Sequence, residues 1–178
     1  MKTKVLHNRL EQINGLYTEL MGHYQVLLGD TEKIAEIAAG LVFEGENPNL
    51  PDASLASLHE TLEHRQKIMQ QVDTVKNDSQ PLEAEVQAIL HLKNFDLAKI
   101  IQLASTPVAH QLAEKQQQMT ELLLRIAHLD QANQKLLAEK LVMLGQVVHK
   151  LNRGKIAREG YGQNDSISPE SRFFDERK

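Results

Sequence analysis

The chain has 178 residues, of which 41% are hydrophobic and 4% aromatic, and its net charge is −4. This balance gives no basic footprint for nucleic acid or for a membrane surface. The absence of Cys excludes disulfides, thiolate catalysis and Cys-ligated zinc. No run approaches the ~18 apolar residues needed for membrane insertion. Few aromatic residues together with many Leu, Gln, Glu, Lys and Ala residues indicate helices packed on helices.

The first stretch with helical periodicity runs from about Val5 to Val42. Its apolar positions recur in two series with a step of seven residues, and the offset between the series alternates between four and three residues. This spacing predicts a long helix with a coiled-coil seam. The first series is Leu6, Ile13, Leu20, Leu27, Ile34 and Leu41, and the second is Leu10, Tyr17, Tyr24, Thr31 and Ala38.

Residues 45–52 (GENPNLPD) hold two prolines, one glycine and two asparagines, and therefore predict a loop. A second helix is expected from about Ala53 to Lys76, and the sequence NDSQP at residues 77–81 predicts the loop that ends it. We expect the aliphatic stem of Arg65 to lie along the apolar face of this helix. The side chains expected to face inward are Leu55, Leu58, Leu62, Met69, Val72 and Val75.

Two short helical segments follow, at about Leu82 to Leu92 and Leu97 to Ala104, and the pattern leaves open whether they form one helix. Asn94 or Asp96 is placed to cap the second segment. Ser105-Thr106 is a stop signal, and Pro107 is placed in the first turn of the next helix.

The longest periodic stretch runs from about Val108 to Ile156. At 1.5 Å per residue such a helix would be roughly 70 Å long, so we expect a rod. Asn133 replaces an apolar residue in the pattern, either as a buried residue that fixes the register or because the helix drifts out of its seam there. The apolar series are Leu112, Met119 and Ile126; Leu122, Leu129 and Leu136; and Leu137, Leu144 and Leu151.

The C-terminal part of this helix carries more apolar side chains than a two-residue seam requires. Such excess is either core against a neighbouring helix or a groove for the amphipathic helix of another protein. The residues are Leu136, Leu137, Leu141, Leu144, Val147, Val148 and Leu151.

Short loops between helices favour antiparallel neighbours. The sequence therefore predicts an all-α fold, an elongated up-and-down antiparallel bundle of three or four coiled-coil-like helices. Residues 1–156 would form the bundle, and residues 157–178, which lack periodicity, a flexible C-terminal tail. Tyr161, Phe173 and Phe174 in this tail would dock on a partner or fold back on the bundle.

The sequence offers little chemistry. His59 and His64 superficially suggest a zinc-protease motif, but a spacing of five residues sets them about 140° apart around a helix, whereas shared ligation needs a spacing of four. No glycine-rich phosphate loop, nucleophile elbow or nucleotide fingerprint occurs. We therefore expect a protein that is not an enzyme and has no cofactor and no metal site.

Residues 129–151 (LDQANQKLLAEKLVMLGQVVHKL), followed by Tyr161-Gly162-Gln163-Asn164-Asp165, resemble the Asn- and Leu-rich final helix and the tail of the FlgN-type flagellar chaperones. Residues 64–75 (HRQKIMQQVDTV) resemble the charged helix of the same family. In layout, the resemblance covers most of the chain.

The resemblance implies a cytoplasmic, non-enzymatic chaperone for flagellar type III export. It would bind the amphipathic terminal helices of hook–filament junction proteins, prevent their premature assembly and deliver them to the export apparatus. We expect Tyr161, which matches the family's tail tyrosine, to contact the export apparatus. The residues expected to bind the client are Leu137, Leu141, Leu144, Val148 and Leu151.

A second function is also open, that of a structural coiled-coil or adaptor protein acting by homo- or hetero-association. The regular seam of residues 5–42 would then be a self-association surface, and the protein a homo-oligomer. Neither function involves nucleic acid or membrane insertion. The first residues, MKTKVLHNRLEQ, lack the apolar core of a secretory signal, which is compatible with the cytoplasm.

Overall fold

The computed structural model describes the backbone of residues 2–43 and 52–162, and the side chains of residues 3–43 and 53–153. In this part of the chain all regular structure is α-helical, which confirms the predicted all-α class. The elements are α1 (Lys2–Gly40), α2 (Asp52–Leu90), α3 (Leu97–Ala104) and α4 (Pro107–Gly162). The loop predicted at residues 45–52 lies almost entirely outside the described residues.

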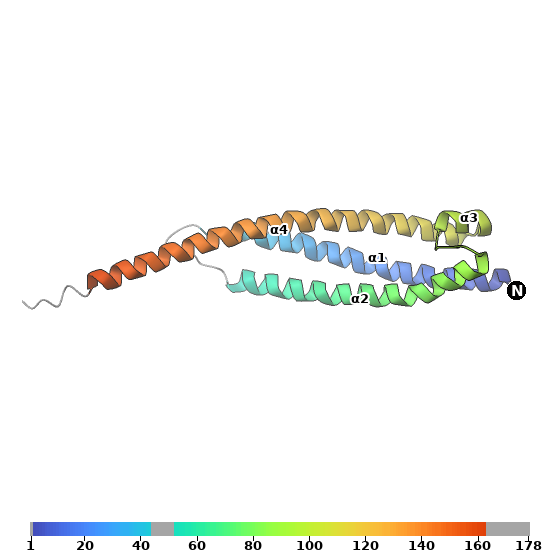
Figure 1. Cartoon of the computed structure of the whole chain (residues 1–178), viewed down its shortest axis with the longest axis horizontal. Helices are drawn as coiled ribbons and strands as arrows, with labels where there is room; N and C mark the ends of the chain where they lie inside the picture. Colours follow the sequence, from blue (N-terminus) through green and yellow to red (C-terminus); the bar gives the residue numbers. More distant parts are fainter. Residues whose placement is uncertain (1, 44–51, 163–178) are drawn as a thin grey trace, which may run out of the picture.

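The three long helices form a rod in which α1 lies between α2 and α4 (Figure 1). α2 runs antiparallel to α1, and α4 runs antiparallel to α2, so the chain passes up, down and up again. The short helix α3 lies at the end of the rod that holds the N-terminus. α1 packs against both other long helices, and α3 packs on α4. The elongated up-and-down bundle is therefore confirmed.

The seam of α1 is buried along its whole length. All eleven residues of the two predicted series are at most 8% exposed. A helix with two partners needs two adjacent apolar stripes, and the alternating offset of four and three residues provides them. The seam faces α2 and α4 of the same chain, so it is not a free surface for self-association.

α2 is one continuous helix, and the loop predicted at residues 77–81 is wrong. Pro81 lies inside the helix, where its missing N–H removes a backbone hydrogen bond and favours a bend. Packing continues on both sides of it, because Val75 and Val86 are both buried. The buried Ser79 hydroxyl donates to the carbonyl oxygen three residues earlier at 2.9 Å. The segment from Leu82 onward is thus the C-terminal part of α2.

The inward face expected for α2 is only partly correct. Val72 and Val75 are buried and Leu58 is half-buried, but Leu55, Leu62 and Met69 are exposed. Thr61 and Ile68 hold buried positions in their place. Each exposed residue is separated by seven from the next, so they form a row of their own beside the true seam. Only contact with α1 decides which of two overlapping rows faces inward.

Polar side chains also join the helices. Arg65, half-buried on α2, donates two hydrogen bonds to the carboxylate of Asp130 on α4. Asn133 on α4 is 5% exposed, and its Nδ2 donates to the carbonyl oxygen of Thr31 on α1 at 2.8 Å. Asn133 is therefore buried in the seam, and the alternative expectation, that the helix drifts out of its seam at this residue, is wrong.

α3 forms at the predicted residues and is a separate helix. Its N-cap is Asp96, whose carboxylate accepts from the Lys99 amide at 3.2 Å. This hydrogen bond from the Lys99 backbone holds the pKa of Asp96 below its usual value. His91 and Ser105 have φ angles of 56° and 38°, and this left-handed backbone interrupts the helical path on either side of α3.

Candidate partner-binding surface

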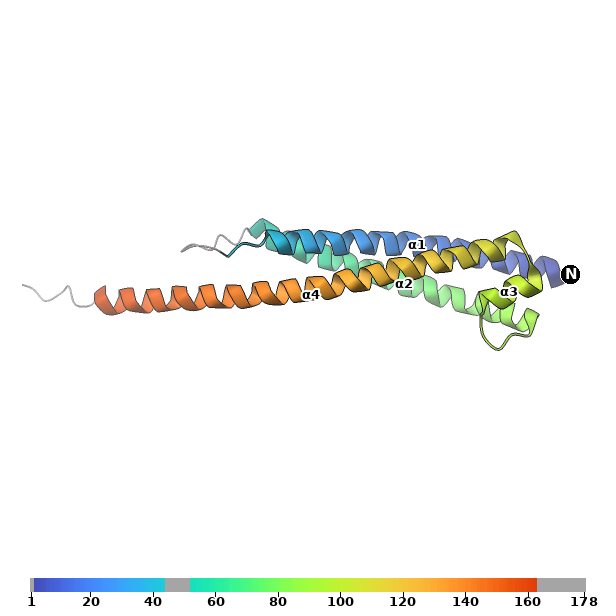
Figure 2. The same cartoon turned by 90° about the horizontal axis from the view of Figure 1, so that it is seen from above.

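α4 is longer than its partners and projects past the end of α1 (Figure 2). Near this end the Lys140 Nζ donates to the carbonyl oxygen of Leu41, just beyond the last residue of α1, at 2.5 Å. The segment from Leu141 to Gly162 is roughly 30 Å long at 1.5 Å per residue. The helix reaches beyond the predicted end at Ile156, and the division into a bundle and a tail at that point stays a prediction.

The five residues predicted to bind a client lie on or next to this projecting segment, and we call them the α4 strip. Leu141, Val148 and Leu151 are 69%, 47% and 43% exposed, and the other two are half-buried. The α4 strip consists of Leu137, Leu141, Leu144, Val148 and Leu151.

The α4 strip continues the face by which α4 packs on the bundle. Its five residues fall within about 40° of Met119 on a helix of 3.6 residues per turn. In the bundle this face is sealed, since Leu112, Met119 and Ile126 are at most 8% exposed. Beyond α1 the same apolar spacing continues with alternating steps of four and three residues. The strip is thus the continuation of a coiled-coil seam beyond the end of its partner helix, α1.

Small side chains flank the strip. Ala138 and Gly145, spaced by seven along one flank, are exposed, and a Cβ added at Gly145 would meet no atom within 4 Å. An incoming helix can therefore approach closely on this flank. Val142 and Met143 are 62% and 50% exposed, but they point about 120–140° away from the centre of the strip and do not belong to it. The side chain of Tyr161, predicted to contact the export apparatus, lies outside the described residues, although its backbone belongs to α4.

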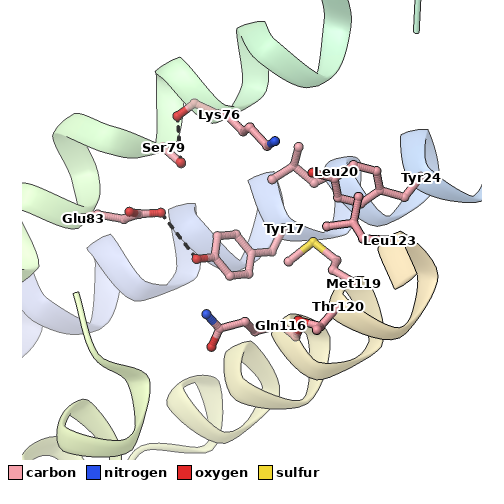
Figure 3. A pocket seen from close by; sticks show the side chains of 10 residues that line it. All are labelled: Tyr17, Leu20, Tyr24, Lys76, Ser79, Glu83, Gln116, Met119, Thr120 and Leu123. Atoms are coloured by element: carbon pink, nitrogen blue, oxygen red, sulfur yellow. Dashed lines mark hydrogen bonds between the residues drawn. The ribbon is translucent and has the colours of Figure 1, made fainter. Parts of the chain in front are cut away.

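Besides the α4 strip, the structure has a hollow between the long helices, which the sequence did not indicate. It is a cavity of about 210 Å³ with α1 side chains on one side and α2 and α4 side chains on the others (Figure 3). It is lined by Tyr17, Leu20, Tyr24, Lys76, Ser79, Glu83, Gln116, Met119, Thr120 and Leu123. The two tyrosines were expected as seam residues, and only the separation of α2 from α4 opens a hollow beside them.

Two contacts involve the tyrosines of this hollow. The Tyr17 hydroxyl donates to Oε1 of Glu83 at 3.4 Å, and Lys76 Nζ lies 5.8 Å from the centre of the Tyr24 ring. Burial, followed by the negative charge of Glu83 and this hydrogen bond, raises the pKa of the Tyr17 phenol. The phenol is therefore neutral at physiological pH and acts as a donor. This arrangement supports packing between helices and contains no activated nucleophile.

The candidate metal-binding histidines are engaged separately. His59 lies 3.3 Å from Glu63, and His64 lies 2.8 Å from Asp30 on α1. Within the described residues no group of three or more His, Asp or Glu side chains is placed to hold a metal ion. The same residues include no helix that is both long and apolar enough to cross a membrane.

A comparison with protein families finds one model, described as FlgN protein, that matches residues 21–168. The chain belongs to the FlgN family. FlgN proteins are flagellar export chaperones, so the family match supports a role in flagellar assembly. The match includes the C-terminal half of α1, all of α2 and α3, and the whole of α4 with its strip. No curated protein and no solved structure matches this FlgN chain.

Proposed function

We propose that this FlgN protein is a cytoplasmic chaperone for the hook–filament junction proteins of the flagellum. It binds their amphipathic terminal helices on the α4 strip, prevents their premature assembly and delivers them to the export apparatus. The observation that carries the proposal is the bare seam on α4. Its residues have the spacing of a helix-packing surface, and α1 and α2 leave it uncovered.

The size of the strip is sufficient for specific binding. Each buried Leu or Val contributes about 1.5–3 kcal/mol relative to exposure, so five of them give roughly 7–15 kcal/mol of gross stabilisation. Leu137 and Leu144 are already half-buried, so covering them by a client contributes less binding free energy than covering a fully exposed side chain would. Association and ordering cost at least several kcal/mol. A dissociation constant near the micromolar range, which corresponds to about 8 kcal/mol, is compatible with this balance.

We assign contact with the export apparatus to Tyr161. Its backbone belongs to the last turn of α4, at the end of the helix that projects past α1. The assignment is supported by the match of this residue to the tail tyrosine of the family. Substituting Tyr161→Ala should leave client affinity unchanged and weaken capture of the chaperone–client complex by the export apparatus. Loss of client affinity in this variant would contradict the assignment.

The client site is tested by a pair of matched leucines. Leu141 on the strip and Leu124 in the bundle are 69% and 68% exposed, lie on the same helix and point about 100° apart. Leu141→Asp combined with Leu151→Asp removes about 3–6 kcal/mol of apolar burial, which predicts a 10²- to 10⁴-fold loss of affinity. Leu124→Asp should change affinity less than threefold.

Affinity is measured by calorimetric titration with terminal peptides of hook–filament junction proteins. Circular dichroism checks that all variants keep their helices, as expected for substitutions at exposed positions. Equal affinities for the strip variant and the Leu124→Asp control would overturn the site. A wild-type protein that binds none of these peptides would overturn the choice of client.

A further inference from the structure

The α4 strip exposes apolar side chains in a part of α4 that projects past α1, where none of the described residues of the other helices covers it. A helix gains most of its stability from packing of its apolar face, so this segment is stabilised by whatever covers the strip. Residues 163–178, which lie outside the described residues, follow directly after Gly162 in the sequence. We propose that, when no client is bound, residues 163–176 fold back along α4 and cover the α4 strip with Phe173 and Phe174.

The first argument is reach. About twelve residues lead from Gly162 to Phe174, and if four of them make the reversal, the remaining eight span roughly 26–29 Å when extended. Along α4, with 1.5 Å per residue, this distance corresponds to about 18 residues, the level of Leu144. The two aromatic side chains therefore reach the middle of the strip.

The second argument is composition at the reversal and in the returning segment. The sequence Gly162-Gln163-Asn164-Asp165 holds residue types that favour turns. Ile167, Phe173 and Phe174 are the large apolar residues that follow. Two of the four phenylalanines of the chain thus stand together at the distance from Gly162 that matches the strip.

The third argument is charge. Residues 141–162 contain four Lys or Arg and one Glu, whereas residues 163–178 contain four Asp or Glu and three Lys or Arg. The two segments therefore attract each other when they lie antiparallel. Asp175 and Glu176, which follow the phenylalanines, reach the level of Lys140 beside the strip. This complementarity favours the segment of the same chain over a second copy of α4, whose projecting part has the same positive charge.

The fold-back makes the segment a competitor of the client. If the strip is covered in nine of ten molecules, client binding is weakened about tenfold, because the apparent dissociation constant is the intrinsic one divided by the open fraction. This consequence rests on the proposed function, whereas the fold-back itself does not. The two are therefore tested in separate experiments.

Because the chain has no Cys, introduced cysteine pairs report the contact without interference. Val148→Cys with Arg172→Cys places one thiol on the strip and one at the matching level of the returning segment. Gln146→Cys with Arg172→Cys is the control, since Gln146 is exposed at nearly the same height and about 160° away around the helix. In the full-length, client-free protein, the strip pair should form an intramolecular disulfide at least tenfold faster than the control pair.

Replacing both phenylalanines by Ala in the strip pair should reduce its rate to that of the control. Equal rates for the two pairs would overturn the fold-back, and so would a disulfide that forms only between two copies. In the second experiment, the same Phe173→Ala and Phe174→Ala replacements in the cysteine-free chain should tighten binding of a client peptide about tenfold. Unchanged affinity together with a fast strip disulfide would show that the covering does not compete. Absence of client binding in all variants would contradict only the proposed function.

Discussion

Substitutions of Asn133 test whether a buried polar contact sets the register of α4 along α1. The Asn133 Nδ2 donates to the carbonyl oxygen of Thr31 at 2.8 Å, and both side chains are almost fully buried. The Thr31 hydroxyl donates to the carbonyl oxygen of Leu27 at 2.7 Å and does not compete for Asn133. The contact therefore fixes one height on α4 relative to one height on α1.

Three substitutions at this position separate stability from register. Asn133→Ala loses one hydrogen bond and some packing, which predicts about 1–2 kcal/mol of destabilisation. Asn133→Leu puts an apolar side chain into an otherwise apolar face, and we expect stability equal to or above that of the wild type. Asn133→Asp buries a carboxylate opposite a carbonyl oxygen, and a loss of about 3 kcal/mol or more is expected at neutral pH.

Stability is measured by urea unfolding followed by circular dichroism. Register is measured by joining cysteines on α1 and α4 with a short bifunctional thiol crosslinker. Glu32→Cys with Arg125→Cys reports the native register, because the tips of these two side chains form an ion pair at 2.5 Å and the crosslinker replaces their length. Glu32→Cys with Ala132→Cys reports a shift of one heptad.

In the wild-type background only the native pair should be crosslinked. With Asn133→Leu added, the shifted pair should be crosslinked as well, because an all-apolar face no longer penalises the displaced register. The reasoning would be refuted if the leucine variant were less stable than the alanine variant, or if its register remained wholly native.

Three further predictions concern polar contacts. Arg65→Ala should lower the free energy of unfolding in urea by about 1–2 kcal/mol, because its ion pair with Asp130 is bidentate and partly buried. A double-mutant cycle with Asp130→Ala should give a coupling energy of about 1 kcal/mol, and zero coupling would contradict the role of the pair. Because the pKa of Tyr17 is raised in the folded state, its contribution to stability should be complete below its usual pKa of 10.0 and decline as the pH rises above it. Tyr17→Phe should remove this alkaline decline. Equal slopes of unfolding free energy against pH for both proteins between about pH 9 and 12 would refute the prediction. The pKa of Asp96 is lowered, so its contribution to stability is present above its usual pKa of 3.8 and is lost as the pH falls below that value. Asp96→Asn caps the helix without a charge and should reduce the fall of the unfolding temperature at acid pH. An unchanged dependence of the unfolding temperature on acid pH would contradict the capping role.

Local patterns were sufficient where one helix face dominates. The two series on α1 predicted its buried residues completely, because a strict spacing of four and three leaves no alternative face. α3 was predicted residue for residue, since Asp96 offers a cap and Ser105 precedes the next helix start. The face of α4 through Leu112, Met119 and Ile126 was predicted for the same reason as that of α1.

Local patterns failed where two signals compete. At Pro81 the turn-forming residues of the segment predicted a loop, but burial of Val75 and Val86 on α1 favours one continuous helix. On α2, the row of Leu55, Leu62 and Met69 was as apolar as the true seam. A row of side chains becomes core only where another helix covers it, and no local pattern contains that information.

The sequence by itself determined that this FlgN chain is an all-helical rod, which residues of α1 are buried, and that the C-terminal half of α4 carries surplus apolar residues. These properties depend on the order of residues along one helix. Only the tertiary structure decided that the surplus is exposed, because exposure depends on where α1 stops. α4 extends past it, and a seam that would be core in a shorter helix becomes a surface for a partner.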